Sequence, residues 1–289
     1  MKRAFNHITY ETFGIRPTEF YAGKFIGARG DIDWLADPKH HFHLEFGRAR
    51  FLAHNIKGPR VLDLGCGSAP FAQTLRVHSE ARELFGLDLD PACVAIAAQV
   101  YDHAATFDIG EPLPFSDGYF DSVFSCDVFG HIEFRHKDRL IAEIRRVTRD
   151  GGPSVHIIES APLDYDQMTA DPDDPIRRYV LMEGHVGMES AEALIARWSC
   201  VFARVAVENA MLYPFTTIPG YLLDPHTPDE LKTIMRDFTD AQLEAAHISL
   251  GYVLERMIEW YRSQQPDLLT PADNHPIRRA SGLVNLIAS

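Results

Sequence analysis

The sequence predicts an α/β protein with a doubly wound, mainly parallel sheet, an N-terminal helical cap and a helical insertion before the last strand. From residue 60 onward, short apolar strands alternate with stretches of helical periodicity, which is the pattern of βαβ units. Residues 1–57 and 211–275 fall outside this alternation. We therefore expect one domain over residues 1–289, whose core comprises residues 58–210 and 276–289.

The elements follow from apolar patterning in chain order. Strands are expected at residues 60–64, 83–89, 104–107, 120–126, 154–159, 201–207 and 281–288. Helices are expected at 69–77, 91–100, 137–149 and 190–198, with Pro91 at a first helical position. In the helix over 137–149, the spacing of Leu140, Ile141, Ile144 and Val147 places one apolar face against the sheet. Further helical stretches are expected at 38–56 in the cap and at 228–237 and 240–263 in the insertion.

Composition narrows the class of protein. With 46% hydrophobic residues in 289, the chain can bury a substantial core. Its 41 acidic residues against 28 basic ones give a formal charge of -13, which disfavours nucleic acid and anionic membranes as partners. No apolar run is long enough to span a bilayer, and the N-terminus lacks a signal-peptide core. Four separated cysteines without a C-x-x-C pair favour reduced thiols, so we expect a cytoplasmic protein.

A glycine turn follows the first strand of the core. Gly65 and Gly67 in the segment GCGSAP can adopt positive φ and let a ligand approach the backbone closely. A dinucleotide fingerprint would need a third glycine where Pro70 stands. Asp63, two residues before the turn, would repel a pyrophosphate but attract an ammonium group. The charge pattern therefore favours an amino-acid-bearing nucleoside over a dinucleotide.

Acidic residues follow the next two strands as well. Asp88 lies 21 residues after Gly67, at the end of a strand where a carboxylate can accept both hydroxyls of a ribose. Asp108 and Ile109 follow the third strand and can meet an adenine edge with a carboxylate and a backbone N–H. The three strand ends together predict a nucleoside cleft.

The segments VLDLGCGSA, LFGLDLDP, FDIGEPLPFSDGYFDSVFSCDVFGHI and LIAEIRRVTRDGG together resemble the class I S-adenosylmethionine-dependent methyltransferases, in particular the group acting on small molecules. The resemblance covers about residues 58–160. It implies a seven-stranded Rossmann-like methyltransferase fold that moves a methyl group from S-adenosyl-L-methionine to an O, N or C atom of a small-molecule acceptor. The sequence departs from the family pattern at Ala69, Gly130 and Asp150, which leaves the acceptor side open.

The resemblance also implies roles for individual residues. Asp63 and the glycine turn would surround the methionine part of the cofactor, Asp88 would hold the ribose, and Leu89 would pack on the adenine. Cys126 would lie beside the sulfonium. The whole predicted cofactor-binding set is His43, Asp63, Gly65, Cys66, Gly67, Asp88, Leu89, Asp108, Ile109, Cys126 and Asp127.

Few residues in the sequence indicate where the methyl acceptor would bind. A sulfonium methyl is already activated, so only some acceptors need a base. His131 is the candidate base, although the family commonly has a histidine there for packing. His185 is a base, a substrate hydrogen-bond donor or a loop anchor, and Tyr21 and Phe129 are candidate walls of the acceptor pocket. His156 is expected to pack between the sheet and a helix.

The segment DPKHHFHLEFGR carries three histidines and a glutamate within six residues, which raises the question of a metal site. On a helix over 38–56, each step turns about 100°, so the His40/His43 and His41/Glu45 pairs do not converge on one point. We therefore expect no metal there. In related methyltransferases a basic side chain at this distance before the glycine turn binds the methionine carboxylate. His43 is the candidate for that role, with Arg48 as the alternative.

Two other readings stay open. One is a methyltransferase directed at a protein, and the other is a module of the same fold that binds the cofactor without catalysis. The sequence leaves open the acceptor, the role of residues 211–275 and the choice between monomer and homodimer.

Overall fold

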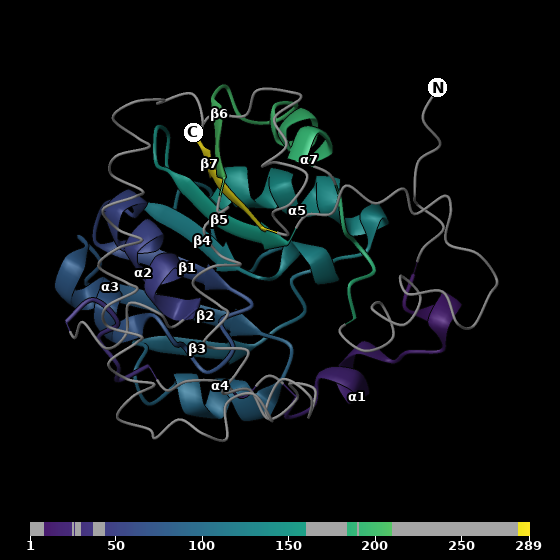
Figure 1. Ribbon diagram of the computed structural model, residues 1–289, viewed down its shortest axis with the longest axis horizontal. Helices are drawn as coiled ribbons and strands as arrows, with labels where there is room; N and C mark the ends of the chain where they lie inside the picture. The colour runs from purple at the N-terminus through teal and green to yellow at the C-terminus, as the bar shows by residue number, and fades with distance from the viewer. Residues whose placement is uncertain are drawn as a thin grey trace, which may run out of the picture.

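In the computed structural model, which describes residues 9–24, 26, 30–36, 44–159, 184–189, 191–209 and 283–289, seven strands form one sheet (Figure 1). Their order is β3-β2-β1-β4-β5-β7-β6. The strands are β1 (Arg60–Leu64), β2 (Glu83–Asp88), β3 (His103–Thr106), β4 (Ser122–Cys126), β5 (Ser154–Glu159), β6 (Val205–Asn209) and β7 (Leu283–Ala288). The predicted mainly parallel, doubly wound sheet is confirmed.

Only β7 departs from the parallel arrangement among the paired strands that the structure describes. The pairs β2/β3, β1/β2, β1/β4 and β4/β5 are all parallel, whereas β7 lies antiparallel between β5 and β6. From β1 the chain first adds β2 and β3 on one side, and it then returns to add β4 and β5 on the other side. The connections that leave the carboxyl ends of β1 and β4 run to opposite sides of the sheet, and open α/β sheets bind ligands at such a point.

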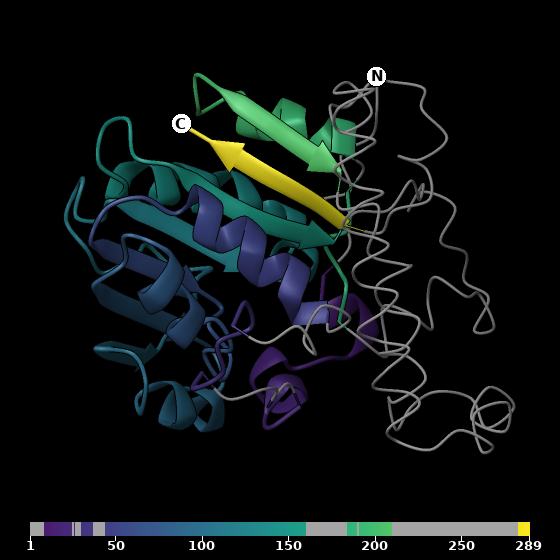
Figure 2. The same cartoon turned by 60° about the vertical axis from the view of Figure 1, so that its left-hand side comes forward.

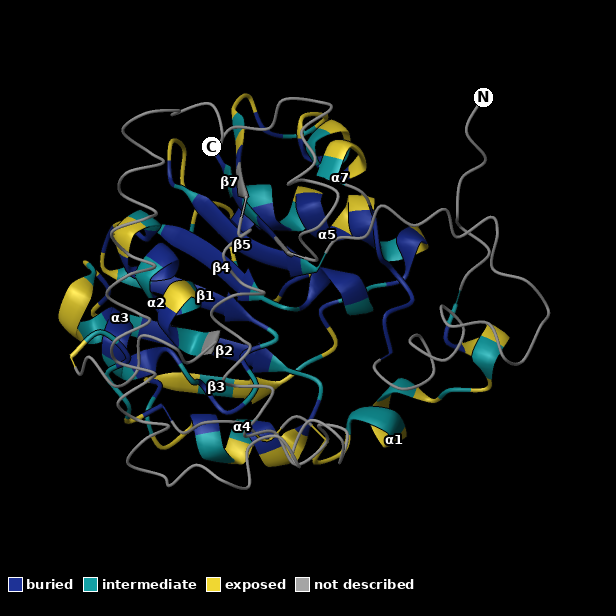
Figure 3. Cartoon of the chain, viewed as in Figure 1, coloured by how far each residue is buried: buried dark blue, intermediate teal, exposed yellow. Residues whose placement is uncertain are grey.

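Helices cover both faces of the sheet (Figure 2). On one face, α2 (Leu44–Asn55), α3 (Ala72–His78) and α4 (Pro91–Ala97) contribute to a buried cluster with Val61, Phe124 and Ile157. On the other, α5 (Phe134–Val147) and α7 (Ala191–Trp198) join a second cluster with Val123 and Leu286. Buried segments concentrate along the sheet and the helix faces that meet it (Figure 3).

The predicted apolar stripes are confirmed. Leu140, Ile141, Ile144 and Val147 are all buried on α5. On α2, Phe46, Ala49 and Ala53 are buried, as is Ile56 directly after the helix, while His54 on the far side is exposed. Burial of one stripe per helix, rather than intrinsic helix propensity, is what stabilises short helices of this length.

Several boundaries differ from the predicted ones. The helix after β1 begins at Ala72 instead of 69, because Ala69 has a left-handed backbone with φ 58°. The strand expected at 201–207 begins only at Val205, because backbone hydrogen bonds from Val201 and Phe202 to Trp198 continue the turn after α7. The helix expected at 137–149 begins one turn earlier, at Phe134, whose buried side chain extends the apolar face.

The cap is described in part. It contains a 3-10 turn η1 (Glu11–Phe13) and α1 (Pro17–Tyr21). His43 and most of DPKHHFHLEFGR before Leu44 lie outside the described residues, as does the whole predicted insertion 211–275. Among the helices of the described ranges, none is long and apolar enough to cross a membrane.

Candidate active site

A cavity of ≈ 710 Å³ lies at the carboxyl ends of the parallel strands. Its walls come from the loops after β1, β2, β3 and β4, from the last residue of β5, and from α1, α2 and residue 185. Every predicted cofactor residue except His43 lines it, and so do Tyr21, His131 and His185. Strand ends that are far apart in the sequence thus meet at one site, because parallel strands end at the same edge of a sheet.

The glycine turn after β1 has the conformation that its sequence predicts. Gly65 has φ 67° and Gly67 has φ 50°, both in the left-handed region. A side chain on Gly65 would also bring its Cβ to 2.5 Å from Val128 Cγ2, so there is no room for one. The backbone N–H groups of Gly65 and Cys66 donate to the Leu87 carbonyl at 2.7 and 3.0 Å, which fixes the turn against β2.

Asp63 lies under the turn and is buried. Its Oδ2 accepts a 2.7 Å hydrogen bond from the Tyr101 hydroxyl. Burial raises the pKa of the Asp63 carboxyl well above its usual range, and the charge of Asp88 adds to the rise against the lowering effect of the Tyr101 hydrogen bond. Burial of this kind disfavours the charged form of a carboxyl, whereas a cation beside it favours that form.

Asp88 closes the turn from the neighbouring strand. Its Oδ2 accepts from the Gly67 backbone at 2.8 Å and its Oδ1 accepts from Asp90 at 2.8 Å. Leu89 lines the cavity beside it. Further along this wall, Asp108 Oδ1 accepts from Gly110 at 2.8 Å, and Ile109 is buried. The acids at the ends of the second and third strands therefore face one cleft, as predicted from their positions.

The opposite wall carries an ion pair between α2 and the end of β4. Arg48 Nη2 donates to Asp127 Oδ2, and Arg48 Nη1 lies 3.2 Å from Glu45 Oε1. Asp127 has a left-handed backbone with φ 54° and lines the cavity. Its Oδ1 is buried without a hydrogen-bond partner among the described residues. Such an acceptor, together with the crowded glycine turn, fits a ligand that brings its own N–H groups.

A chain of hydroxyl groups orients His131. The Tyr10 hydroxyl donates to the His131 carbonyl at 2.6 Å and lies 2.5 Å from the Tyr21 hydroxyl, which in turn lies 3.0 Å from His131 Nδ1. Because the backbone carbonyl can only accept, Tyr10 accepts from Tyr21, and Tyr21 accepts from His131 Nδ1–H. The ring of His131 is therefore held with Nε2 directed away from the tyrosines.

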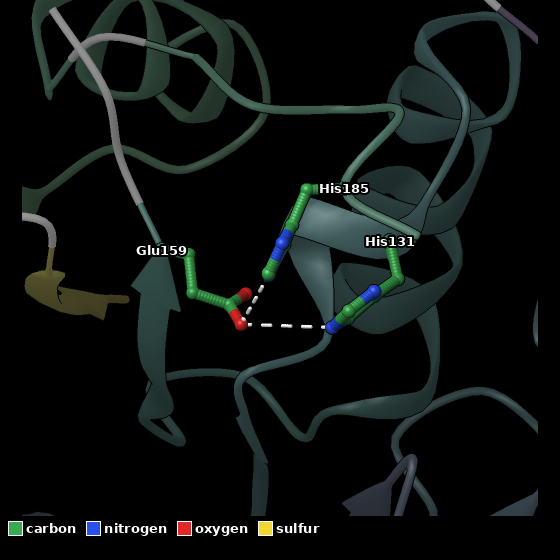
Figure 4. A group of neighbouring side chains, drawn as sticks. All are labelled: His131, Glu159 and His185. Carbon is green, nitrogen blue, oxygen red and sulfur yellow. Dashed lines mark hydrogen bonds and ion pairs between the residues drawn. The ribbon is translucent and has the colours of Figure 1, made fainter. Parts of the chain in front are cut away.

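His131 Nε2 faces Glu159, the last residue of β5 (Figure 4). Glu159 Oε1 lies 3.5 Å from His131 Nε2 and 2.8 Å from His185 Nε2. The two imidazole rings stack with centroids 4.4 Å apart. Burial raises the pKa of Glu159, but the two histidines outweigh it, so the carboxyl pKa lies below its usual range. The site thus has a polar end with a buried carboxylate between two imidazoles.

The loop that presents His185 is held by a buried ion pair. Lys137 on α5 is fully buried, lies 2.7 Å from Glu189 Oε2 and also donates to the Gly187 carbonyl. Arg197 on α7 lies 2.7 Å from Glu189 Oε1. Side chains from α5 and α7 thereby hold the loop 184–189 in place. The position of His185 thus depends on this ion pair as well as on its own contacts.

One predicted acceptor residue lies elsewhere. Phe129 is fully buried and packs against His156 and Trp198, with ring centroids 5.4 and 5.3 Å away, so it belongs to the core and not to the lining of the cavity. The reason is that the 3-10 turn η3 (Phe129–His131) rotates each successive side chain by about 120°, so Phe129 and His131 point in different directions. His156 packs between sheet and helix as predicted, held by Ser125 and Ser154 at 2.7 and 2.6 Å.

Among the cavity residues that were not predicted, Glu159 and Tyr10 contact the predicted residue His131. Glu159 ends a parallel strand, which is the signal that identified Asp63 and Asp88, so the same rule could have found it. Tyr10 has no such signal, since it lies 121 residues before its partner His131.

The comparisons with known proteins agree with this geometry. Residues 62–155 match the family model described as methyltransferase domain. Over 120 residues, 40% of the chain, it is 28% identical to the phthiotriol/phenolphthiotriol dimycocerosates methyltransferase of Mycobacterium leprae and 32% identical to the demethylmenaquinone methyltransferase of Thermus thermophilus. These alignments cover 44% and 53% of the two relatives, so the chain matches about half of their length.

Solved structures share the fold. The phosphoethanolamine N-methyltransferase 2 of Haemonchus contortus, in complex with S-adenosyl-L-methionine, superimposes with a TM-score of 0.53 at 19% identity, covering 87% of this chain and 56% of that one. The [4+2]-cyclase SpnF gives a TM-score of 0.53 at 17% identity and covers 99% and 96%. Residues 62–155 therefore form a methyltransferase domain of the class I S-adenosylmethionine-dependent family, whose cofactor is S-adenosyl-L-methionine.

Proposed function

We propose that the protein transfers the methyl group of S-adenosyl-L-methionine to an O, N or C atom of a small-molecule acceptor. The observation that carries this is the cavity itself, which joins the glycine turn and its strand-end acids to a polar end made by His131, Glu159 and His185. The two curated relatives are named for small-molecule acceptors rather than for proteins or nucleic acids. The net charge of -13 agrees with an acceptor that is not a nucleic acid.

We assign the cofactor to the end of the cavity that the glycine turn lines. Asp63 and Asp127 supply carboxyl oxygens for the ammonium of the methionine part, and Asp88 is placed to accept the ribose hydroxyls. Arg48 is the described cation on this wall and takes the role predicted for it as the alternative to His43. His43 itself lies outside the described residues and stays a prediction.

When bound, the cofactor supplies an electrophilic methyl on a sulfonium, so the chain's own task is to align the acceptor and exclude water. Cys126 and Asp127 lie between the two ends of the cavity and are assigned to the region of the sulfonium. Tyr21, His131 and His185 line the other end and are assigned to the acceptor. His131 is the group there that can take a proton from an acceptor hydroxyl or amine.

Cofactor binding is tested by thermal unfolding with S-adenosyl-L-methionine and its demethylated product. Each should raise the melting temperature of the wild-type protein, since a ligand that binds only the native state stabilises it. Asp88→Ala should abolish the shift, while His54→Ala, on the exposed side of α2, should leave it intact. No shift with the wild type at millimolar cofactor contradicts the proposal.

The acceptor class is tested with a cell extract and cofactor that carries a labelled methyl group. Label should appear in the filtrate of low molecular mass and should be lost with Asp88→Ala. Label retained with protein would instead support the protein-directed alternative. Cofactor binding without any labelled product would support a non-catalytic module of the same fold.

A further inference from the structure

We propose that His131, Glu159 and His185 bind one divalent first-row transition-metal ion at the acceptor end of the cavity. One ligand atom from each residue can be chosen so that all three lie within 4.8 Å of one another. Glu159 Oε1 is 2.8 Å from His185 Nε2 and 3.5 Å from His131 Nε2. Metal bonds of about 2.1 Å place neighbouring ligand atoms about 3.0 Å apart in octahedral and about 3.4 Å apart in tetrahedral sites. The two separations from Glu159 Oε1 bracket these values.

The hydrogen bonds of His131 Nδ1 orient the imidazole ring for metal binding through Nε2. The chain from His131 Nδ1–H through Tyr21 and Tyr10 to a backbone carbonyl keeps the proton on Nδ1. With the proton on Nδ1, the lone pair of Nε2 is directed at the Glu159 carboxylate, and a metal ion between them would be bound by both. A metal-bound histidine is normally oriented in this way by a hydrogen bond from its other ring nitrogen.

The surroundings favour a cation bound between the three side chains. The side chains of His131, Glu159 and His185 are only 16%, 13% and 7% exposed, so an uncompensated charge there is costly. Glu159 Oε2 is buried without a hydrogen-bond partner among the described residues. The two imidazole rings stack with centroids 4.4 Å apart, on the same side of the carboxylate, so one ion can contact all three groups.

The donor set also indicates which ions fit. Two imidazole nitrogens and one carboxylate oxygen suit Zn²⁺, Fe²⁺ or Co²⁺ better than Mg²⁺ or Ca²⁺, which prefer oxygen ligands. Three protein ligands on the wall of a cavity leave positions for water or an acceptor. If the proposed methyl transfer holds, the ion would bind an acceptor hydroxyl and lower its pKa, and His131 would be a ligand instead of the base.

The test is a titration of chelator-treated full-length protein with Co²⁺, followed by visible absorption and calorimetry, in the absence of cofactor. We expect one equivalent to bind with the absorption of a low-symmetry nitrogen and oxygen site. Glu159→Gln and His185→Ala should each weaken binding by about 100-fold or more, since even outer partners of metal ligands are worth about 10 to 100-fold. His54→Ala removes an exposed histidine and should keep the wild-type affinity.

Thermal unfolding of each variant is measured first. Glu159→Gln keeps the shape of the side chain and is the decisive variant if His185→Ala does not fold. Absence of a one-equivalent site in the wild type, or unchanged affinity in Glu159→Gln, overturns the proposal and leaves a hydrogen-bonded imidazole pair. Because no cofactor is present, that result says nothing against methyl transfer.

Discussion

The Tyr101 hydroxyl donates a 2.7 Å hydrogen bond to Asp63 Oδ2, directly beneath the turn that precedes α3. The two residues come from β1 and from the segment before β3, and both are buried. Burial raises the pKa of Asp63 well above its usual range, and an ammonium group beside the carboxyl would lower that pKa again. Cofactor binding and ionisation of Asp63 are therefore linked.

We expect cofactor binding near neutral pH to release up to one proton, because the ammonium group of the cofactor favours the ionised form of Asp63. Calorimetry in two buffers with different ionisation enthalpies measures the number of protons. In Asp63→Asn the apparent binding enthalpy should no longer depend on the buffer through this residue. Equal enthalpies for the wild type in both buffers would contradict the linkage.

Gly65→Ala should destabilise the protein more than Gly151→Ala. Both glycines have positive φ, 67° and 74°, so both variants carry a backbone cost of about 1–2 kcal/mol. At Gly65 the new Cβ also meets Val128 Cγ2 at 2.5 Å, whereas nothing lies within 4 Å at Gly151. Overpacking of this kind adds about 1–3 kcal/mol. Urea unfolding of both variants measures the difference, and equal losses would show that Val128 simply moves aside.

Glu189→Gln should cost more stability than Lys137→Met. Removing the Glu189 charge takes the contacting carboxylate from Lys137, which is 0% exposed and keeps its hydrogen bond to the Gly187 carbonyl. Removing Lys137 leaves Glu189 still paired with Arg197 at 2.7 Å. Breaking a buried pair costs about 3–5 kcal/mol when a charge is left uncompensated, so we expect that loss for Glu189→Gln and a smaller one for Lys137→Met. The free energy of unfolding in urea decides the order, and the reverse order would refute it.

His156 should make the protein sensitive to acid. Burial lowers its pKa from 6.5 to about 3, so between these values the unfolded state binds a proton that the native state does not. Stability therefore falls as the pH drops below 6.5, by up to about 1.4 kcal/mol per pH unit from this residue.

The check is to compare urea unfolding of the wild type and His156→Gln at pH 7 and pH 5. The variant should be less stable at pH 7, because it loses packing against Phe129 and Trp198, but its free energy of unfolding should fall less on acidification. A parallel fall in both proteins would mean that other groups cause the acid sensitivity.

The sequence alone determined the core of this fold and which strand-end residues line its cavity. Strands such as Arg60–Leu64 and Ser154–Glu159 have the bounds that their apolar runs predict, because each run is local and must be buried. Glycines at a strand end and acids at the next strand ends are also local signals. Parallel strands end at the same edge of a sheet, so these glycines and acids must lie close together. For this reason the sequence predicts that Asp63 and Asp88 share one cavity.

The acceptor side was decided by the tertiary structure. Phe129 and His131 are two residues apart, yet one enters the core and the other the cavity, because a tight turn separates their directions. Tyr10 meets His131, and Glu159 meets His185, across long stretches of chain whose contacts no local pattern encodes. Whether a histidine is a solvated side chain, a packing residue or a ligand depends on which groups face its two nitrogens. Only the packing of distant segments sets that environment.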